Sequence, residues 1–349
     1  TDVNHIFAAF CDTKGLEELS IRGDVDHHLD DGFMAGCIPS LAACKGMRKL
    51  NLIFLNLSTR SCAALSAVFP QMTMVHELDL GDNSINDGGV EVLVRGLANC
   101  KHLHSLRLCR NSIADDGLEM LIQSLPANVD TLDLRRNAIA LARQLPLLRF
   151  KELHLSCDTL STGGPGVIAA SLANPECRLE LLDLISTAVG DEGAAILAPS
   201  LRNNQRLARM TLEDNSITET GWDAFSSILC DASSINATHG SNHTLQHLGG
   251  LQEICHDVRS MLALNAFRDK SRVAARKILR AHRHLDMRPL FDRELDLLPR
   301  VVAWLERFAD SRPGLKLSSI FDFVRAMPME VVDGIAGEKK GKELRCNGL

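Results

Sequence analysis

Hydrophobic residues recur along most of the chain in one short pattern. Apolar residues stand at positions one, four and six, an asparagine at position nine and an isoleucine at position eleven. Four copies carry the full pattern, with their asparagines at Asn83, Asn111, Asn137 and Asn215. Weaker copies keep the apolar positions and replace the asparagine with Leu55, Asp158 or Thr187. The chain is therefore built from repeats of one structural unit.

Each copy predicts a strand followed by a helix. The alternation of Leu78 and Leu80 predicts a short parallel strand whose leucines face the core. Apolar residues at helical spacing follow, as at Val90, Leu93 and Leu97. One such unit cannot bury both apolar faces alone, so neighbours must stack into a curved solenoid. We expect the pattern asparagines to bond buried backbone groups from one repeat to the next.

Two places depart from the spacing of about 28 residues. Only 21 residues separate Val129 from Phe150, and Pro146 lies between them, which leaves no room for a long helix. We expect the helical side to thin there. The next candidate ladder residue after Asn215 is Asn242, which predicts a last, irregular turn of the solenoid.

The repeat pattern stops at Leu245, and the remaining sequence reads as helices. They are predicted at Leu248 to about Ala266, 269–284, 290–308 and 318–327. An open end of a solenoid exposes core, so we expect these helices to cap it. The predicted fold class is therefore α/β, a solenoid with parallel strands on the concave face, helices on the convex face and a helical C-terminal cap. Its parts are 1–247 with about eight or nine repeats, 248–333 as the cap, and 334–349 as a flexible tail.

The repeats resemble ribonuclease-inhibitor-type leucine-rich repeat proteins, the subtype shared by nucleotide-binding immune receptors and Ran GTPase activators. This resemblance covers about Leu16 to Thr244. A further likeness is to leucine-rich repeat families of diatoms and related algae, and it extends through Phe323–Pro328. It is carried by the segments Cys230–Thr238, Ser241–Gln246, Lys277–Arg280 and Leu285–Leu290. The resemblance implies the solenoid fold and an extended recognition surface, and it implies no particular ligand.

Composition narrows the function classes. The net charge of −6 argues against a strongly basic nucleic-acid binder, and the absence of tyrosine leaves few platforms for stacking bases. Eleven cysteines without a Cys-x-x-Cys pair indicate neither a disulfide framework nor a zinc site. We find no catalytic signature and expect no enzyme activity, no metal and no cofactor. No export signal or membrane span is visible, so the expected location is the cytoplasm.

The candidate binding residues lie on the predicted concave face. Arg107, Arg110, Arg135 and Arg136 come from two neighbouring repeats, and arginine recognises carboxylates through its planar fork. In one interpretation, these arginines exceed what Asp130 and Asp133 can neutralise and bind a partner. In the other, the aspartates hold them and the face compensates its own charge. Further candidates on this face are Ile53, Phe54, Asp79, Asp82, Glu213 and Asp214.

The leading hypothesis is a non-enzymatic scaffold that binds another protein, with an acidic surface, on its concave face. One alternative is a regulator of a small GTPase, resembling Ran GTPase activators. Another is the ligand-sensing part of a larger receptor. The helix from Arg268 to Arg283 is strongly basic, but its apolar residues suffice to dock it, so we expect its charges to face water rather than nucleic acid or an anionic membrane. The oligomeric state stays open.

Overall fold

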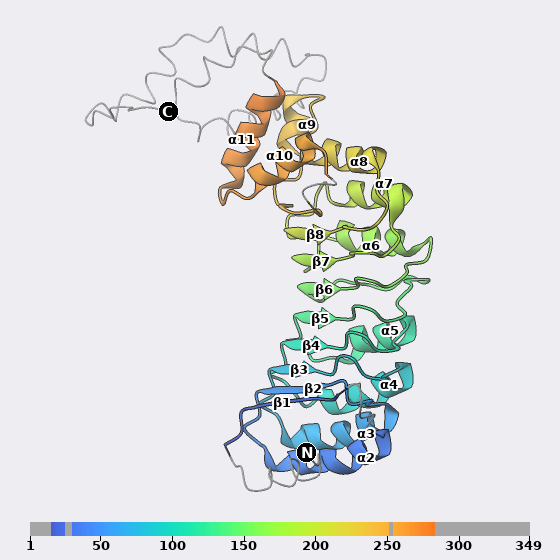
Figure 1. Ribbon diagram of the computed structural model, residues 1–349. Coiled ribbons are helices and arrows are strands. Elements are labelled where there is room, and N and C mark those ends of the chain that lie inside the picture. The colour runs from blue at the N-terminus through green and yellow to red at the C-terminus, as the bar shows by residue number, and fades with distance from the viewer. Residues whose placement is uncertain (1–14, 25–29, 251–253, 283–349) are drawn as a thin grey trace, which may run out of the picture. The chain divides into compact units, whose positions relative to one another are not determined.

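The computed structural model describes residues 15–24, 30–250 and 254–282 (Figure 1). The chain divides into two compact units. The first, here called the repeat unit, comprises Thr1–Asp231 and Gly240–Lys270. The second comprises Ala232–His239 and Ser271–Leu349.

A single parallel sheet of eight strands, in chain order, runs through the repeat unit. Its central leucines stay in register, so that Leu50 pairs with Leu78 and Leu78 with Leu106. The strands are β1 (Glu18–Arg22), β2 (Lys49–Ile53), β3 (Glu77–Asp79), β4 (Ser105–Arg107), β5 (Thr131–Asp133), β6 (Glu152–His154), β7 (Leu181–Asp183) and β8 (Arg209–Thr211). The predicted solenoid is confirmed.

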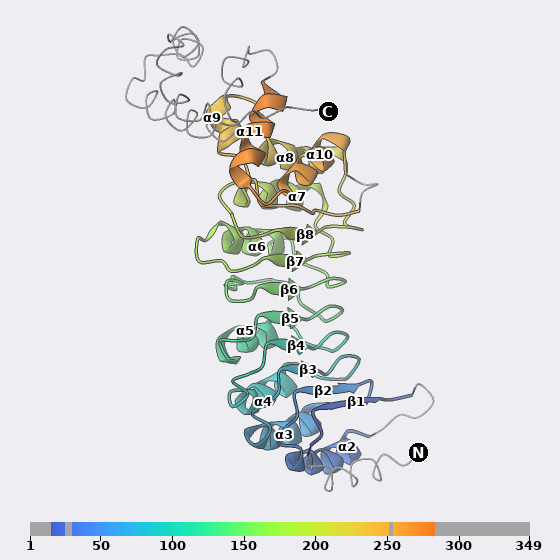
Figure 2. The same cartoon turned by 90° about the vertical axis from the view of Figure 1, so that its left-hand side faces the viewer.

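Helices cover one side of this sheet, and the strands form the other side (Figures 1 and 2). The helices are α2 (Asp31–Cys37), α3 (Thr59–Val68), α4 (Asp87–Leu97), α5 (Asp115–Ser124), α6 (Gly164–Ala173), α7 (Gly190–Ser200) and α8 (Glu219–Leu229), with the 3₁₀ turns η2 (Ile38–Ala43) and η3 (Phe69–Gln71). Neighbouring strands stand about 4.8 Å apart and packed helices about 8–10 Å apart. The repeat unit therefore curves toward its strands, and the strand side is the concave face.

The hydrophobic core lies between the sheet and the helices. Leu106 of β4 and Leu118 of α5 are fully buried, and the central leucine or methionine of every strand from β2 to β8 is at most 1% exposed. Cys44 and Cys100, each three residues before a strand's first apolar position, are also fully buried. Their position in the repeat explains these cysteines, as predicted.

The predicted asparagine ladder is present. Oδ1 of Asn111 accepts a hydrogen bond from the Ile85 N–H at 2.9 Å, and Nδ2 donates to the carbonyls of Leu80 and Leu108, both at 3.0 Å. Asn83, Asn137 and Asn215 make the same kind of contacts with their own neighbours. Only Asn215 is fully buried, whereas the other three side chains are half-buried at the sheet edge.

The prediction that Asn242 continues this ladder is wrong. Oδ1 of Asn242 accepts a hydrogen bond from the N–H three residues later at 2.9 Å, and Asn204 does the same. Arg209 of β8 bridges to His247, which places Asn242 before the next strand position rather than after it. Asn242 is thus the counterpart of Asn204, not of Asn215.

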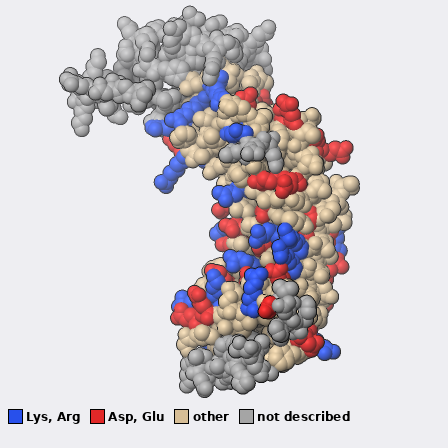
Figure 3. All heavy atoms as spheres, viewed as in Figure 1, with Lys and Arg blue, Asp and Glu red and all other residues tan. Residues whose placement is uncertain are grey.

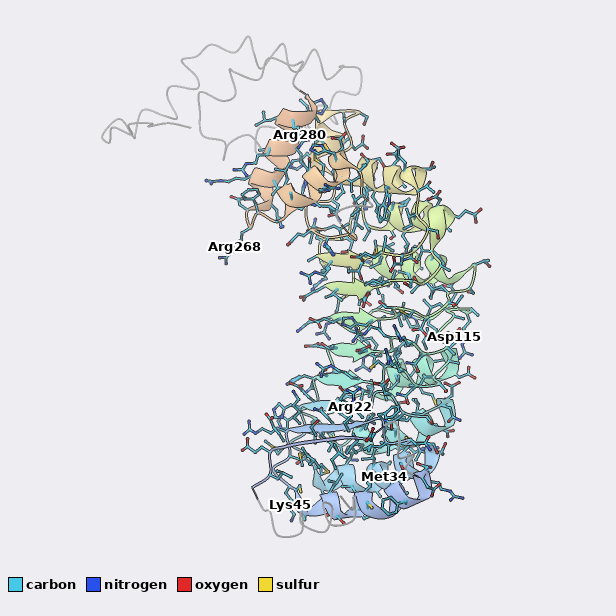
Figure 4. All side chains as sticks on the ribbon, viewed as in Figure 1. Arg22, Met34, Lys45, Asp115, Arg268 and Arg280 are labelled. Carbon is cyan, nitrogen blue, oxygen red and sulfur yellow. The ribbon has the colours of Figure 1, made fainter. Side chains whose placement is uncertain are left out.

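The repeat between β5 and β6 has no helix, as predicted. Its extended segment is bonded to both ends of α5. The Asp115 carboxylate accepts hydrogen bonds from three consecutive N–H groups, 140–142, at 2.7–2.9 Å. The Arg149 guanidinium donates to three carbonyls at the C-terminal end of α5. Figure 4 shows Asp115 on the helix side of the unit. Two charged side chains therefore replace the helix packing that this repeat lacks.

A second ladder, made of aspartates, was not predicted. The carboxylate of Asp87, in the first turn of α4, accepts a hydrogen bond from the Ala114 N–H of the next repeat at 2.8 Å. Asp31, Asp115 and Asp191 bond the following repeat in the same way. Glycine faces two of these carboxylates, because a Cβ atom on Gly117 would lie 2.5 Å from Oδ1 of Asp87 and one on Gly221 would lie 2.4 Å from Oδ1 of Asp191. An aspartate with a glycine one or two residues later was the available signal.

The first predicted C-terminal helix begins later than expected. Helix α10 (His256–Asn265) belongs to the repeat unit and packs on α8. The chain before it still extends the sheet, since the Leu248 carbonyl accepts a hydrogen bond from the Leu212 N–H at 2.9 Å. That bond explains why the predicted helical start at Leu248 is wrong. The helices predicted at 290–308 and 318–327, and the tail at 334–349, lie outside the described residues.

The helix predicted at 269–284 is observed as α11 (Lys270–Ala281), and a short helix, α9 (Ile235–His239), precedes it in the chain. In the second unit, the Thr238 hydroxyl lies 2.9 Å from Nε2 of His282. Contrary to expectation, not all basic residues of α11 face water. Lys277 is fully buried, because it lies one helical turn from the buried Val273 on the same face. Among the described residues, no helix has the length and apolarity needed to cross a membrane.

Candidate partner-binding face

Each strand contributes one central side chain to the concave face, and together these side chains form a column across the sheet. Because side chains alternate along a strand, the residue after each buried central leucine points away from the core. In chain order this column reads Ser20, Asn51, Asp79, Arg107, Asp133, His154, Asp183 and Thr211. The predicted charge-alternating ladder of Asp79, Arg107 and Asp133 is therefore in register.

Arg107 also contacts a glutamate outside the central column. Its Nη1 lies 3.7 Å from Oε2 of Glu77, and that same oxygen lies 3.2 Å from Nζ of Lys49. Burial raises the pKa of Asp79, while a hydrogen bond from Gly81 and the charge of Arg107 act against that increase. Arg107 is thus exposed but shares its acid with a second cation.

Arg135 is held by a buried carboxylate. Its Nε and Nη2 donate to the two oxygens of Asp133 at 2.9 and 2.7 Å, and only 3% of Asp133 is exposed. For this residue the self-compensating interpretation holds. Asp130 does not join the cluster, because it pairs with Lys151 at 2.7 Å and Arg178 at 3.2 Å.

Arg110 and Arg136 stand at the turn that ends each strand. Their φ angles are 52° and 57°, in the left-handed region that disfavours side chains with a Cβ. The corresponding residues of other repeats share this conformation, namely Phe54, Asp82, Cys157, Ser186 and Asp214. Arg110 lies 3.3 Å from Asp82, whereas Arg136 makes no ion pair with any described residue. Arg136 is therefore the exposed guanidinium of the cluster without a neutralising partner in that part of the chain.

A hollow of about 390 Å³ opens among these turns, here called the concave hollow. It is lined by Asp82, Cys109, Arg110, Arg135, Arg136, Ser156, Cys157, Asp183 and Ile185. In the middle of the repeat unit, basic and acidic side chains lie side by side on the surface (Figure 3). The hollow thus combines three guanidinium groups with apolar and thiol-bearing walls.

Comparison with known proteins identifies the repeat. Residues 71–94 and 99–121 match the family model described as "Leucine Rich repeat". Mouse ribonuclease inhibitor is 26% identical over 219 residues, which cover 59% of this chain and 41% of that protein. The mouse protein named "NACHT, LRR and PYD domains-containing protein 3" is 26% identical over 218 residues, which cover 62% of this chain and 19% of that protein. The chain is a leucine-rich repeat protein, and its repeats are similar to those of ribonuclease inhibitor.

The match covers less than half the length of either relative, about a fifth of the longer one and two fifths of the inhibitor. A solved internalin from Listeria monocytogenes aligns with 65% of this chain and 62% of that chain, with a TM-score of 0.41 and 18% sequence identity. The eight-stranded parallel sheet and the repeats establish the fold.

One network on the face of this leucine-rich repeat protein was not singled out from the sequence. Asp183 accepts a hydrogen bond from the Thr211 hydroxyl at 2.6 Å and lies 3.2 Å from Nδ1 of His154. Burial alone would raise the pKa of Asp183, but hydrogen bonds from His154, Ser156 and Thr211 hold it well below its usual range. His154, Asp183 and Thr211 stand in the central column, so their register was the signal that could have found them.

The other predicted candidates lie outside the concave hollow. Ile53 and Phe54 are half-buried at the end of β2. Glu213 and Asp214 follow β8, where Glu213 lies 3.8 Å from His247. Histidine rings also stack at the opposite edge of the sheet, with 5.6 Å between the centroids of His76 and His102. In the part of the leucine-rich repeat protein that is described, no group of His, Cys, Asp and Glu has the arrangement of a metal site.

Proposed function

We propose that this leucine-rich repeat protein is a scaffold that binds another protein on its concave face. The repeats and the relatives support an interaction scaffold in general. Ribonuclease inhibitor is named for its action on a ribonuclease, itself a protein, which favours a protein ligand here too. The partner's surface is acidic, and the arginine cluster lies at the centre of the contact.

The observation that carries this proposal is the chemistry of the concave face. Its columns keep a strict register over eight strands, yet the central column holds charged and polar side chains, most of them half-buried, that the sheet itself does not require. Solenoids use such faces as extended recognition surfaces. Arginine at the centre of a contact is a frequent hot-spot residue, because it forms paired hydrogen bonds with carboxylates.

The candidate arginines fall into two groups according to the ion pairs that they already form. Arg107, Arg110 and Arg136 present exposed guanidinium groups to a partner, and Arg135 orients the surface through Asp133. The flanking residues contribute the rest of the contact area. They are Ile53 and Phe54 on one side, Asp79 and Asp82 within the cluster, and Glu213 and Asp214 on the other side.

Photo-cross-linking tests where the partner binds. Cys157 is an exposed thiol on the concave hollow, so a thiol-reactive benzophenone can be attached there after Cys11 and Cys346, which lie outside the described residues, are replaced by serine. The matched control carries Cys157→Ser and Ile196→Cys, because Ile196 is 44% exposed on α7. We expect a cross-linked polypeptide from the Cys157 adduct only. Equal cross-linking from both positions, or none from Cys157, would overturn concave-face binding.

A further inference from the structure

We infer that the concave hollow binds the carboxylate of an acidic peptide segment between Arg136 and Arg110, with a short apolar side chain against Cys157 and Ile185. This inference rests on the proposed protein-binding function and assigns its central contact. It distinguishes two arginines that contact the partner from a third, Arg135, that positions the surface.

The backbone places Arg110 and Arg136 at neighbouring positions of the ladder. The Arg110 N–H donates to the Arg135 carbonyl at 2.7 Å, and the Arg136 N–H donates to the Ser156 carbonyl at 2.9 Å. These bonds continue the parallel ladder beyond the strands, so Arg110 and Arg136 occupy equivalent positions one strand spacing apart, about 4.8 Å. That spacing suits two cations that share one carboxylate.

The charges around the hollow select which arginine is available. Arg135 already bonds both oxygens of Asp133. Arg110 has one contact, at 3.3 Å, with the half-buried Asp82. Arg136 has no ion pair among the described residues, so an incoming carboxylate meets it first.

The surrounding acids favour a peptide over a polyanion. Asp82 and Asp183 line the hollow, and Asp79 and Asp133 lie on the neighbouring strands. A nucleic-acid backbone would bring a regular row of phosphates against these carboxylates, which is repulsive. A single acidic side chain meets only the local pair of guanidinium groups. The hollow of about 390 Å³ also has room for the side chain next to it, which Ile185 and the exposed Cys157 would contact.

Protection of Cys157 gives a direct test. The probe is an acetylated, amidated hexapeptide with two adjacent glutamates between valines, and its control has glutamine in place of glutamate. Iodoacetamide alkylation of Cys157 is followed by peptide mass spectrometry. Cys109, the other thiol that lines the hollow, has a pKa raised to about 11 by burial and reacts slowly. We expect the glutamate peptide at millimolar concentration to slow alkylation of Cys157 by at least about threefold, and the glutamine peptide to have little effect.

Arginine variants test which residue is responsible for the protection of Cys157. Arg136→Gln should abolish protection, Arg136→Lys should retain part of it, and Arg95→Gln should leave it unchanged, because Arg95 pairs with Glu91 on α4. A thermal melt confirms that each variant is folded. Protection that persists in Arg136→Gln, equal protection by the glutamine peptide, or no protection would overturn the inference.

Inorganic phosphate at the same concentration forms a separate arm. Equal protection by phosphate would mean that the hollow binds small anions without selecting a peptide, and it would also overturn the inference. Cross-linking through Cys157 does not depend on either result, so failure of this assignment and failure of concave-face binding are distinguishable.

Discussion

Two neighbouring stretches of the sheet keep the same register by different means. From β3 to β5, asparagines link the strand ends, and α4 and α5 cover the sheet. Between β5 and β6, an extended segment replaces the helix, and Asp158 takes the place of the ladder asparagine. Leu132 and Leu153 still pair directly. The leucines therefore set the register, whereas the helix and the asparagine can be replaced.

The replacement changes the chemistry of the ladder. Asn137 both accepts a backbone hydrogen bond and donates through Nδ2 to the Leu108 and Leu134 carbonyls. Asp158 accepts from the N–H groups of Asn137 and Ile139 at 2.8 and 3.2 Å, but its buried Oδ2 has no hydrogen-bond partner. Burial and, more weakly, the nearby Asp133 raise the pKa of this carboxyl to about 7, although the hydrogen bonds from Ile139 and Asn137 act against that increase. Only the protonated form can donate as an asparagine does.

The largest effect should come from Asp158→Asn, which makes the unusual repeat resemble the regular ones. The pKa is about 7 in the folded protein, against an ordinary value of 3.8. Between pH 3.8 and about 7, the carboxyl is therefore mostly protonated in the folded protein and mostly ionised in the unfolded chain. The stabilisation is complete below about pH 4 and is lost as the pH rises through 7, by at most about 4 kcal/mol. We expect the variant to be more stable than wild type at pH 8 and similar to it at pH 4.5, by urea unfolding.

The reciprocal change, Asn137→Asp, should introduce a similar dependence into a regular repeat. Comparing each variant with wild type at the same pH cancels the titration of groups that they share. A stability difference between Asp158→Asn and wild type that does not change from pH 4.5 to 8 would show that Asp158 is not held as the neutral acid.

Asn111→Leu should weaken the regular region by about 3 kcal/mol in the free energy of unfolding, because several backbone groups lose their partners. The Ile85 N–H would lose its acceptor, and the Leu80 and Leu108 carbonyls would lose a donor. The natural leucine at Leu55 shows that the ladder position accepts this shape. Chemical denaturation measures the change, and a loss below about 0.5 kcal/mol would contradict a structural role for the ladder.

Arg149→Met should cost about 2 kcal/mol, because it removes three charge-assisted hydrogen bonds to the end of α5 while keeping the aliphatic stem. Arg143→Met is the matched control in the same segment. Arg143 pairs with Asp116 and Glu119 at the surface, and its loss should cost less than about 0.5 kcal/mol. Equal thermal shifts for both variants would mean that Arg149 does not anchor the helix-free repeat.

Sequence spacing predicted the regular part of this fold well. The leucine positions identified the strands, and the short interval with Pro146 identified the repeat without a helix. Spacing gave the wrong prediction for Asn242. Asparagines occur both before and after a strand in these repeats, and at the two positions they form hydrogen bonds with different backbone groups. It also did not reveal the bonds of Asp115 and Arg149, since these join segments that only the folded backbone brings together.

For the candidate site, the sequence indicated the correct face but not the state of each charge. It grouped Arg135 with Arg136, which are adjacent in the chain. In the structure Arg135, two residues after β5, folds back onto Asp133, while Arg136 stands in the turn and lines the hollow without an ion pair among the described residues. Which acid neutralises which arginine depends on side-chain geometry across strands, and the pattern of residue types does not encode it.

Separate reversal of Arg136 and Arg135 to glutamate tests the central claim most directly. Affinity for the polypeptide cross-linked through Cys157 and the free energy of unfolding are measured for both variants. Arg136→Glu should weaken binding at least about tenfold, roughly 1.4 kcal/mol, with stability unchanged within about 0.5 kcal/mol. Arg135→Glu should instead lower stability by about 3 kcal/mol, because it places two carboxylates together at the buried Asp133. Wild-type affinity in the folded Arg136→Glu variant would contradict the claim.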